Sequence, residues 1–420
     1  MGYANWDIPS DLFSITPITR ETTKNFIGRI QLVRTYTKHL KRKKIVAVFE
    51  GDIGTGKTSL GNYIRFSEPN FFTTDIEIMS QAHWGSREFL LALQSAILNT
   101  CRKKQEFEAL MKDELFVKLF DRNSNIRVSN AQAGIQIFGN GLNGGKETLI
   151  SQPIHLDDQT LIAELNEMLE KIRQTKSSNN GVSLEEIKVI FQINNLDPNQ
   201  LPFSEDLIVG FLNSIRDLLT ATIPASFIIN GAIGLQALIQ KSVKRLEPAV
   251  MFERILPLSV EELIEALNKR IINSNMKGEI PFERDLIENL YKSTRGNFRG
   301  TLGLMEALAN HADINEMIIT KISMRDCLEY FYNANKNLLK SISEKDNDLT
   351  NKGKIIKAIK DNMTLSLNEI SEKTGIKQSN TSNYVSDLKS DGIIIKNKNS
   401  NLVECTLSPR YYFAAQLYFK

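Results

Sequence analysis

The sequence predicts an α/β protein in which helices flank a parallel β-sheet, followed by a helical subdomain and a C-terminal winged helix. Three observations support this fold class. A glycine-rich loop near residue 50 stands between an apolar run and an amphipathic segment. Helix-like and strand-like patterns then alternate up to about residue 258. The last part of the chain, from residue 353, has the pattern of three short helices and a hairpin with a polar tip.

The glycine-rich loop is the most specific motif in the chain. Residues 51–58 read GDIGTGKT, which fits the phosphate-binding P-loop pattern G-x-x-x-x-G-K-[ST]. Glycines let backbone N–H groups face phosphate oxygens, Lys57 places a positive charge on the β- and γ-phosphates, and the Thr58 hydroxyl can ligate Mg²⁺. The motif predicts binding of ATP or GTP with Mg²⁺. The residues expected to contact the nucleotide are Gly51, Asp52, Ile53, Gly54, Thr55, Gly56, Lys57, Thr58 and Ser59.

Four apolar segments are expected to form the sheet. Ile187–Ile193 and Ser226–Asn230 are continuous apolar runs, as strands buried on both faces should be. The other two strands are expected at Ile45–Phe49 and Asn70–Met79.

The interval between the second and third strands is unusually long. Helices are expected at Arg87–Phe120 and Asp158–Gln174, with a polar loop from Thr175. Between these helices, Asn125–Val128 and Gly134–Phe138 alternate like a β-hairpin. This pattern predicts an insertion into the nucleotide domain at about residues 123–152.

The composition is that of an ordinary soluble globular protein, with 41% hydrophobic and 24% charged residues. Net charge is only +3, but Lys352–Lys420 carries 11 Lys or Arg against six Asp or Glu. Three widely separated cysteines indicate reduced thiols and a cytoplasmic location. No signal peptide is visible, and the most apolar stretch, Ile223–Ile239, is too interrupted to span a membrane.

The part of the chain after the sheet is expected to be mostly helical up to about Asn337. Ser259 and Glu262 form a capping-box pattern at its start. The predicted organisation is an N-terminal arm (1–20), a nucleotide-binding base (21–258), a helical lid (259–340), a polar linker (341–352) and a winged-helix domain (353–420).

The C-terminal segment predicts a winged helix. Gly375 supplies the tight turn between two helices, and Ile393–Lys396 and Leu402–Thr406 enclose a basic tip, which would be the wing. Polar side chains on the third helix suit bases and phosphates, with Thr381 and Tyr384 among those expected to be exposed. A winged helix that docks a protein is the alternative. The residues expected to bind DNA are Lys377, Gln378, Ser379, Asn380, Asn383, Lys389 and Lys398.

The second half of the nucleotide site departs from the usual pattern. P-loop ATPases normally end the third strand with an Asp and then a Glu, whereas here Asn194 and Asn195 follow Ile193. Asn194 can still hydrogen-bond a metal-bound water, so it is assigned to the metal together with Thr58. Asn195 occupies the catalytic position but cannot accept a proton, and loss of a general base typically costs about 10²–10⁴ in rate. Slow or absent hydrolysis is expected, unless a substitute carboxylate restores it; the candidates are Asp197, Glu77 and Asp75.

Two further side chains are expected to reach the γ-phosphate. Asn230 ends the fourth strand, where a polar side chain would approach the nucleotide. Arg299 follows Gly296, Asn297 and Phe298 at the start of a helix, from which its guanidinium could fold back and report the γ-phosphate.

The order of these pieces resembles the AAA+ ATPases of the origin-recognition (ORC/Cdc6-like) type. Residues 26–29, FIGR, are similar to their adenine-side motif, which adds Gly28 and Arg29 to the cofactor-binding residues, although an acidic residue is usual at Ile30. Asn230 matches the sensor-1 position. Arg299 matches the sensor-2 arginine, with Phe298 in place of a proline.

The resemblance implies an α/β P-loop NTPase (AAA+) fold with a helical lid and winged helix, and ATP buried where subunits meet. A neighbouring subunit would donate an arginine from near Arg245 or Arg254. The predicted function is a cytoplasmic ATP switch that self-associates on ATP and binds duplex DNA. The alternative is a signalling or scaffold NTPase, as in bacterial defence or transposition regulation, whose winged helix and hairpin bind a protein partner. An active motor is disfavoured by Asn194 and Asn195.

Overall fold

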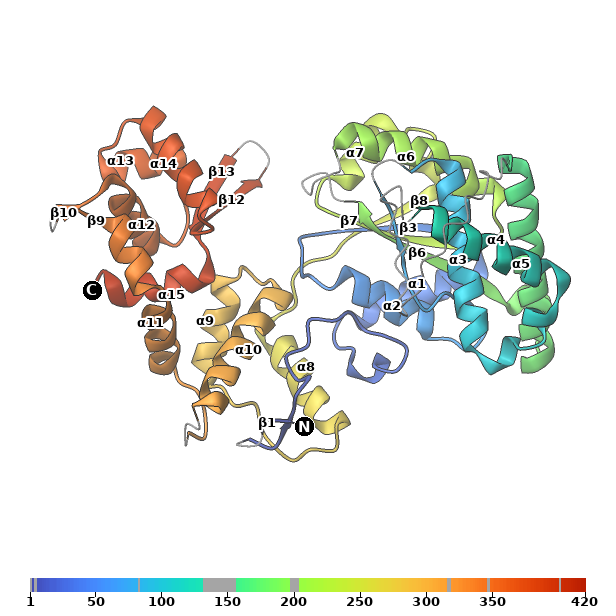
Figure 1. Cartoon of the computed structure of the whole chain (residues 1–420), viewed down its shortest axis with the longest axis horizontal. Helices are drawn as coiled ribbons and strands as arrows, with labels where there is room; N and C mark the ends of the chain where they lie inside the picture. Colours follow the sequence, from blue (N-terminus) through green and yellow to red (C-terminus); the bar gives the residue numbers. More distant parts are fainter. Residues whose placement is uncertain are drawn as a thin grey trace. The chain divides into compact units, whose positions relative to one another are not determined.

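The computed structural model describes residues 2–3, 6–81, 84–130, 156–196, 204–315, 319–345, 348–399 and 402–420. The chain forms two compact units (Figure 1). The first, Pro17–Leu256, holds a parallel sheet with flanking helices. The second combines Met1–Thr16 with Pro257–Lys420 and holds helices and a three-stranded antiparallel sheet.

The sheet of the first unit has the strand order β4-β6-β7-β3-β8, and every neighbouring pair is parallel. Its strands are β3 (Val46–Glu50), β4 (Phe71–Thr73), β6 (Lys188–Leu196), β7 (Ser226–Gly231) and β8 (Val250–Arg254), with β5 (Ile78–Met79) pairing the end of β6. Strand β8 is absent from the sequence prediction, because a run with Glu253 and Arg254 lacks a continuous apolar pattern. The strand predicted at Asn70–Met79 is divided into β4 and β5.

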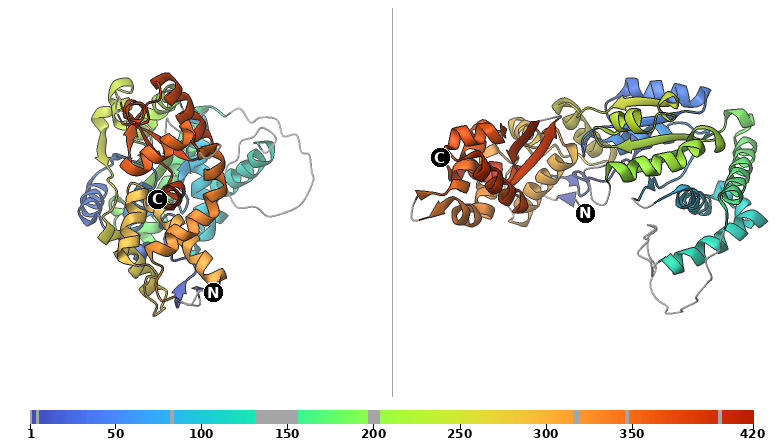
Figure 2. Two further views of the ribbon diagram at one scale, coloured as in Figure 1. Left: turned by 90° about the vertical axis from the view of Figure 1, so that its left-hand side faces the viewer. Right: turned by 90° about the horizontal axis from the view of Figure 1, so that it is seen from above.

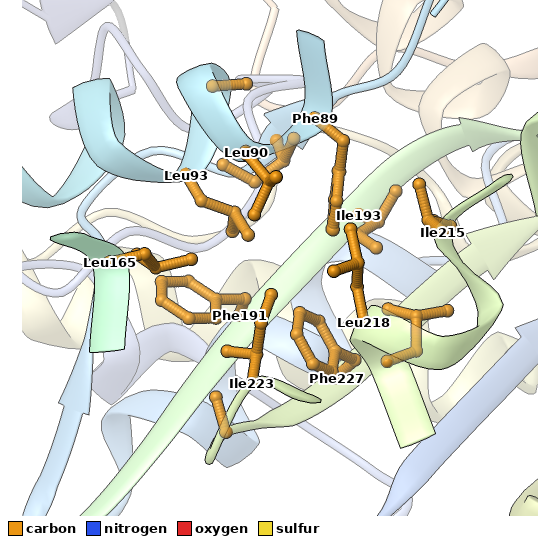
Figure 3. Close-up of a cluster of buried hydrophobic side chains, with 14 of the residues drawn as sticks. Phe89, Leu90, Leu93, Leu165, Phe191, Ile193, Ile215, Leu218, Ile223 and Phe227 are labelled. Atoms are coloured by element: carbon orange, nitrogen blue, oxygen red, sulfur yellow. The ribbon is translucent and has the colours of Figure 1, made fainter. Parts of the chain in front are cut away.

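Helices cover both faces of this sheet. Alternate residues of β6 point to opposite faces: Phe191 joins a core with Phe89 and Phe227 (Figure 3), whereas Ile190 packs in a second core with Leu60 and Ile64 of α2. The helices of this unit are α1 (Ile30–Arg42), α2 (Lys57–Phe66), α3 (Ser86–Lys103), α4 (Glu114–Asn130), α5 (Asp158–Asn180), α6 (Glu205–Asp217) and α7 (Leu235–Ser242).

The long interval between the second and third predicted strands is more helical than expected. Helix α4 continues to Asn130, so the prediction that Asn125–Val128 forms the first strand of a hairpin is wrong. The second predicted strand, Gly134–Phe138, lies outside the described residues. The loop predicted from Thr175 is also wrong, because α5 continues to Asn180 and ends at Gly181, whose φ of 64° is left-handed.

The second unit contains the predicted winged helix. Its three-stranded sheet has the order β11-β13-β12, and β12 pairs antiparallel with β13 as the wing. The elements are β1 (Gly2–Tyr3), β2 (Ile8–Pro9), α8 (Val260–Asn273), α9 (Arg284–Ser293), α10 (Phe298–Ile314), α11 (Met324–Ser343), β9 (Glu344–Lys345), β10 (Asp348–Leu349), α12 (Asn351–Asn362), β11 (Leu365–Ser366), α13 (Leu367–Thr374), α14 (Gln378–Ser390), β12 (Ile394–Asn399), β13 (Leu402–Leu407) and α15 (Pro409–Tyr418).

The winged helix shares one core with the helices before it. The rings of Phe331 on α11 and Phe413 on α15 stack with centroids 5.8 Å apart. Residues 341–352, predicted as a linker, hold the end of α11, the short strands β9 and β10, and the start of α12. They therefore do not separate two independent cores.

The N-terminal residues belong to the second unit. Ile8, Leu12 and Phe13 are completely buried, and the Trp6 indole N–H donates to the carbonyl of Ile319 across 3.1 Å. Both views in Figure 2 place the N-terminus beside the helices of residues 257–343. The part of the predicted arm before Pro17 is thus a core element.

Candidate functional site

The P-loop connects the end of β3 to the start of α2. Gly54 and Gly56 have φ of 80° and 82°, a left-handed conformation that glycine adopts without steric cost. A Cβ at Gly51 would lie 2.5 Å from the carbonyl oxygen of Ile255, so this position also requires glycine. Because α2 begins at Lys57, the loop lies at a helix N-terminus, where backbone N–H groups favour an anion.

The side chains of the loop are arranged around its backbone. The Lys57 ammonium donates to the carbonyls of Gly51 and Asp52, both 2.7 Å away, and therefore lies over the loop. Asp52 and Ile53 are exposed, and in a loop of this kind the backbone N–H groups are the atoms suited to phosphate. The Ser59 hydroxyl accepts a hydrogen bond from the Ile18 N–H at 3.2 Å.

The predicted adenine-side residues lie next to this loop. The Arg29 guanidinium donates to the carbonyls of Thr55, at 2.5 Å, and Leu256, at 2.8 Å. Gly28 and Arg29 both have positive φ and form the entry to α1. The structure thus brings residues that are 26 positions apart together at the loop.

The end of β6 carries a chain of three buried amides. Asn194 Oδ1 accepts from Asn230 Nδ2 at 2.7 Å and from Gln192 Nε2 at 3.3 Å. Gln192 Nε2 also lies 3.3 Å from the carbonyl of Thr58, in the first turn of α2. These contacts join the P-loop helix, β6 and β7 through neutral side chains. Asn194 and Asn230 are predicted site residues, whereas Gln192 is not, although a polar residue inside an apolar strand is a signal that could have identified it.

Asn195 occupies a different environment from its neighbour. It is exposed and has a φ of 71°, and the pairing of β6 with β7 shifts between Ile193 and Leu196. Asn195 is therefore the extra residue of a β-bulge, in a left-handed conformation that asparagine tolerates better than most residues.

The described carboxylates proposed as substitutes are engaged in ion pairs. Glu77 lies 3.3 Å from the fully buried guanidinium of Arg65 and also accepts from Asn62. Asp75 pairs with Lys104 at 3.3 Å and with Arg20 at 3.8 Å. Asp197 lies outside the described residues.

Glu50 is a further carboxylate that the sequence analysis missed. It is buried immediately before the P-loop and accepts from the Gln236 N–H at the start of α7 across 3.0 Å. The available signal was an acidic residue at the end of a strand otherwise made of apolar residues. This hydrogen bond ties the end of β3 to the first turn of α7.

The predicted arginines occupy exposed positions. Arg299 is exposed in the first turn of α10, which Asn297 caps by accepting from the Gly300 N–H. It belongs to the second unit, so its approach to the phosphates remains a prediction. Arg245 and Arg254 are exposed on the first unit, as donation to a neighbouring subunit would require.

The third helix of the winged helix, α14, presents most of the predicted DNA-binding residues to solvent. Its exposed residues include Gln378, Ser379, Asn380, Asn383 and Lys389, and Lys377 is exposed just before it. Lys398 lies in β12.

Two further expectations on α14 need correction. Thr381 is wrongly predicted as exposed, because its hydroxyl is buried and lies within hydrogen-bond distance of the carbonyls of Ile376 and Lys377. Tyr384 is half-buried and its hydroxyl accepts from Asn351 at 3.2 Å.

The parallel strand order, the P-loop between β3 and α2, and the winged helix after the helical subdomain decide the fold. It is an α/β P-loop fold with a parallel sheet, a helical subdomain and a C-terminal winged helix. The predicted α/β class, with a parallel sheet behind the P-loop and a C-terminal winged helix, is therefore confirmed.

Comparisons with known proteins identify similar chains. Residues 348–395 match the family model described as winged helix-turn-helix DNA-binding. The chain is similar to solved structures of Aeropyrum pernix ORC1 in complex with DNA (12% identity, 97% of each chain, TM-score 0.44) and Cdc6p from Pyrobaculum aerophilum (14%, 97% of each chain, 0.40). It is also similar to Aeropyrum pernix ORC2 in ADPNP-ADP complexes (10%, 98% of each chain, 0.43). No curated protein matches the sequence. No helix in the described part of the chain combines the length and apolar character that a membrane crossing requires.

Proposed function

We propose that this protein is an ATP-binding AAA+ switch that hydrolyses ATP slowly or not at all. The observation that carries the proposal is the pairing of a complete P-loop with Asn194 and Asn195 where an Asp and a Glu are usual. The loop supplies backbone donors and Lys57 for the phosphates, and the Thr58 hydroxyl is the side chain offered to Mg²⁺. Neither asparagine can take a proton from an attacking water.

The winged helix is proposed to bind duplex DNA. Its family model carries that description, and α14 exposes amides, a hydroxyl and Lys389, which suit base edges and phosphates. The proposed switch is cytoplasmic and self-associates through its ATP site, with Arg299 reporting the γ-phosphate and Arg245 or Arg254 reaching a neighbour. ATP binding would then control assembly on DNA.

The first test is fluorescence anisotropy of a labelled duplex with ATP and Mg²⁺, with ADP, and without nucleotide. Point variants are preferable to removing the winged helix, because Phe413 completes a core shared with α11. The expected result is binding that strengthens with ATP, that loses this gain in Lys57→Ala and that weakens in Asn380→Ala. DNA binding would also fall steeply with salt.

The opposite outcome favours a different function. ATP binding without DNA binding in any nucleotide state would reject the DNA switch and support the signalling or scaffold NTPase with a protein partner. Steady-state turnover above roughly one per second would reject slow hydrolysis, because typical enzymes turn over at about 1 to 10³ per second.

A further inference from the structure

The side chains that the structure places at the end of β6, beside the P-loop helix, are neutral amides. Asn194 stands where a carboxylate would hold the Mg²⁺ hydration shell, and the groups placed against its oxygen are the amide nitrogens of Asn230 and Gln192. Both acceptor directions of this oxygen are thus used by N–H donors. Their hydrogens carry partial positive charge, so the arrangement opposes a cation at the same oxygen.

The remaining amide oxygens do not replace the missing carboxylate. Among the described atoms, Gln192 Oε1 and Asn230 Oδ1 are buried without a hydrogen-bond partner. Gln192 Oε1 lies against α2, since a Cβ added to Gly61 would come within 2.4 Å of it. Mg²⁺ demands near-ideal octahedral geometry and is usually bound through one or two carboxylates. These residues do not fit Mg²⁺, apart from the Thr58 hydroxyl.

Three carboxylates near the loop do not take the place of the missing one. Asp52, within the loop, is exposed. Glu50 accepts from the start of α7, and Glu77 pairs with Arg65. An ordinary P-loop site repels metal-free ATP through its metal-binding carboxylate, and Mg²⁺ relieves that repulsion. Here the amide chain removes both the repulsion and the metal ligand.

We propose that this site binds ATP with an affinity that hardly depends on a divalent cation. The inference rests on the proposed ATP-binding function and adds how that site selects its ligand: it accepts the free triphosphate as well as the metal complex. The P-loop N–H groups and Lys57 supply the attraction in both cases.

The test is a titration of the full chain with a fluorescent N-methylanthraniloyl ATP, in Mg²⁺ and in EDTA. The two dissociation constants are expected to agree within about threefold, because the described residues place no carboxylate at the position of Asn194, where the metal shell would be held. In Asn194→Asp, the constant in EDTA should rise about tenfold or more over the constant in Mg²⁺, because one negative charge then faces the phosphates. Asn213→Asp, an exposed change of equal charge on α6, should leave the ratio unchanged.

The outcomes distinguish failure of this inference from failure of the proposed ATP binding. Binding of the unaltered chain in Mg²⁺ but at least about tenfold weaker binding in EDTA overturns this inference and leaves the proposed function standing. No binding under either condition overturns both. Thermal melting of Asn194→Asp identifies a folding defect in that variant. The ratio of the dissociation constants in EDTA and in Mg²⁺, measured on the unaltered chain, tests the inference without the variant.

Discussion

Arg29 Nη2 lies 2.5 Å from the carbonyl oxygen of Thr55, in the middle of the P-loop. The same nitrogen lies 2.8 Å from the carbonyl of Leu256, at the end of the first unit. One guanidinium therefore fixes the loop to the residue after which the chain leaves this unit.

Replacing Arg29 with alanine should weaken ATP binding. The loop would lose charge-assisted hydrogen bonds, each worth about 1.5–3 kcal/mol, and we expect the ATP dissociation constant to rise about tenfold. Calorimetric titration measures it. Arg29→Lys keeps the charge but not the planar guanidinium, so its ATP dissociation constant should lie between those of the unaltered chain and Arg29→Ala. An unchanged dissociation constant in Arg29→Ala would show that the contact does not organise the loop.

Restoring ATP hydrolysis should require replacement of both Asn194 and Asn195. Asn195→Glu alone should give no gain, because position 194 would still lack a metal ligand. The left-handed conformation of residue 195 costs a glutamate roughly 1–2 kcal/mol in both variants. The double variant Asn194→Asp, Asn195→Glu should raise phosphate release at least about tenfold, as expected when a general base and a metal ligand return. A full gain from Asn195→Glu alone would contradict this account.

The ion pair between Arg65, near the end of α2, and Glu77 should contribute to the free energy of unfolding. Arg65 is completely buried, its pKa is lowered to about 10 by burial, and it is therefore charged at neutral pH. Glu77→Gln removes its ionic partner and should lower the free energy of unfolding by about 3 kcal/mol. Urea denaturation checks this. Glu68→Gln, which breaks a more exposed pair with Lys41, should cost at most about 1 kcal/mol; equal losses would refute a special role for the buried pair.

The N-terminal segment should stabilise the second unit. Phe13 is fully buried and meets Phe282 edge to face at 5.7 Å between centroids. Phe13→Ala should cost about 3–5 kcal/mol in urea unfolding. Ile15→Ala is the control, because Ile15 is 50% exposed; a comparable loss there would contradict the assignment.

The contribution of Lys377 to DNA binding should show in the salt dependence. Lys377→Gln removes one phosphate contact and should weaken binding uniformly across sequences, lowering the log–log salt slope by about 1. Lys292→Gln, an exposed lysine on α9, should leave the slope unchanged. An unaltered slope in Lys377→Gln would remove this residue from the interface.

The P-loop, the winged helix and the asparagine departure could be predicted because each depends on neighbouring residues. The burial of Thr381 could also have been predicted from the sequence. Val385 and Leu388 follow it at helical spacing, so Thr381 lies on the same buried face of α14. The N-terminal segment was not predictable in this way. Its burial depends on partners as distant as Ile319, 313 positions from Trp6, and local periodicity does not predict such a contact.

Because Ile8, Leu12 and Phe13 complete a core built otherwise from residues beyond Pro257, the two ends of the chain must meet before that core closes. During synthesis the first unit, Pro17–Leu256, is complete before the residues beyond Pro257 that pack against Ile8, Leu12 and Phe13 have been made. It can therefore fold first, and the second unit matures only after the residues beyond Pro257 have been synthesised. Early termination would leave a folded nucleotide-binding unit carrying an exposed hydrophobic segment, a species suited to capture by chaperones.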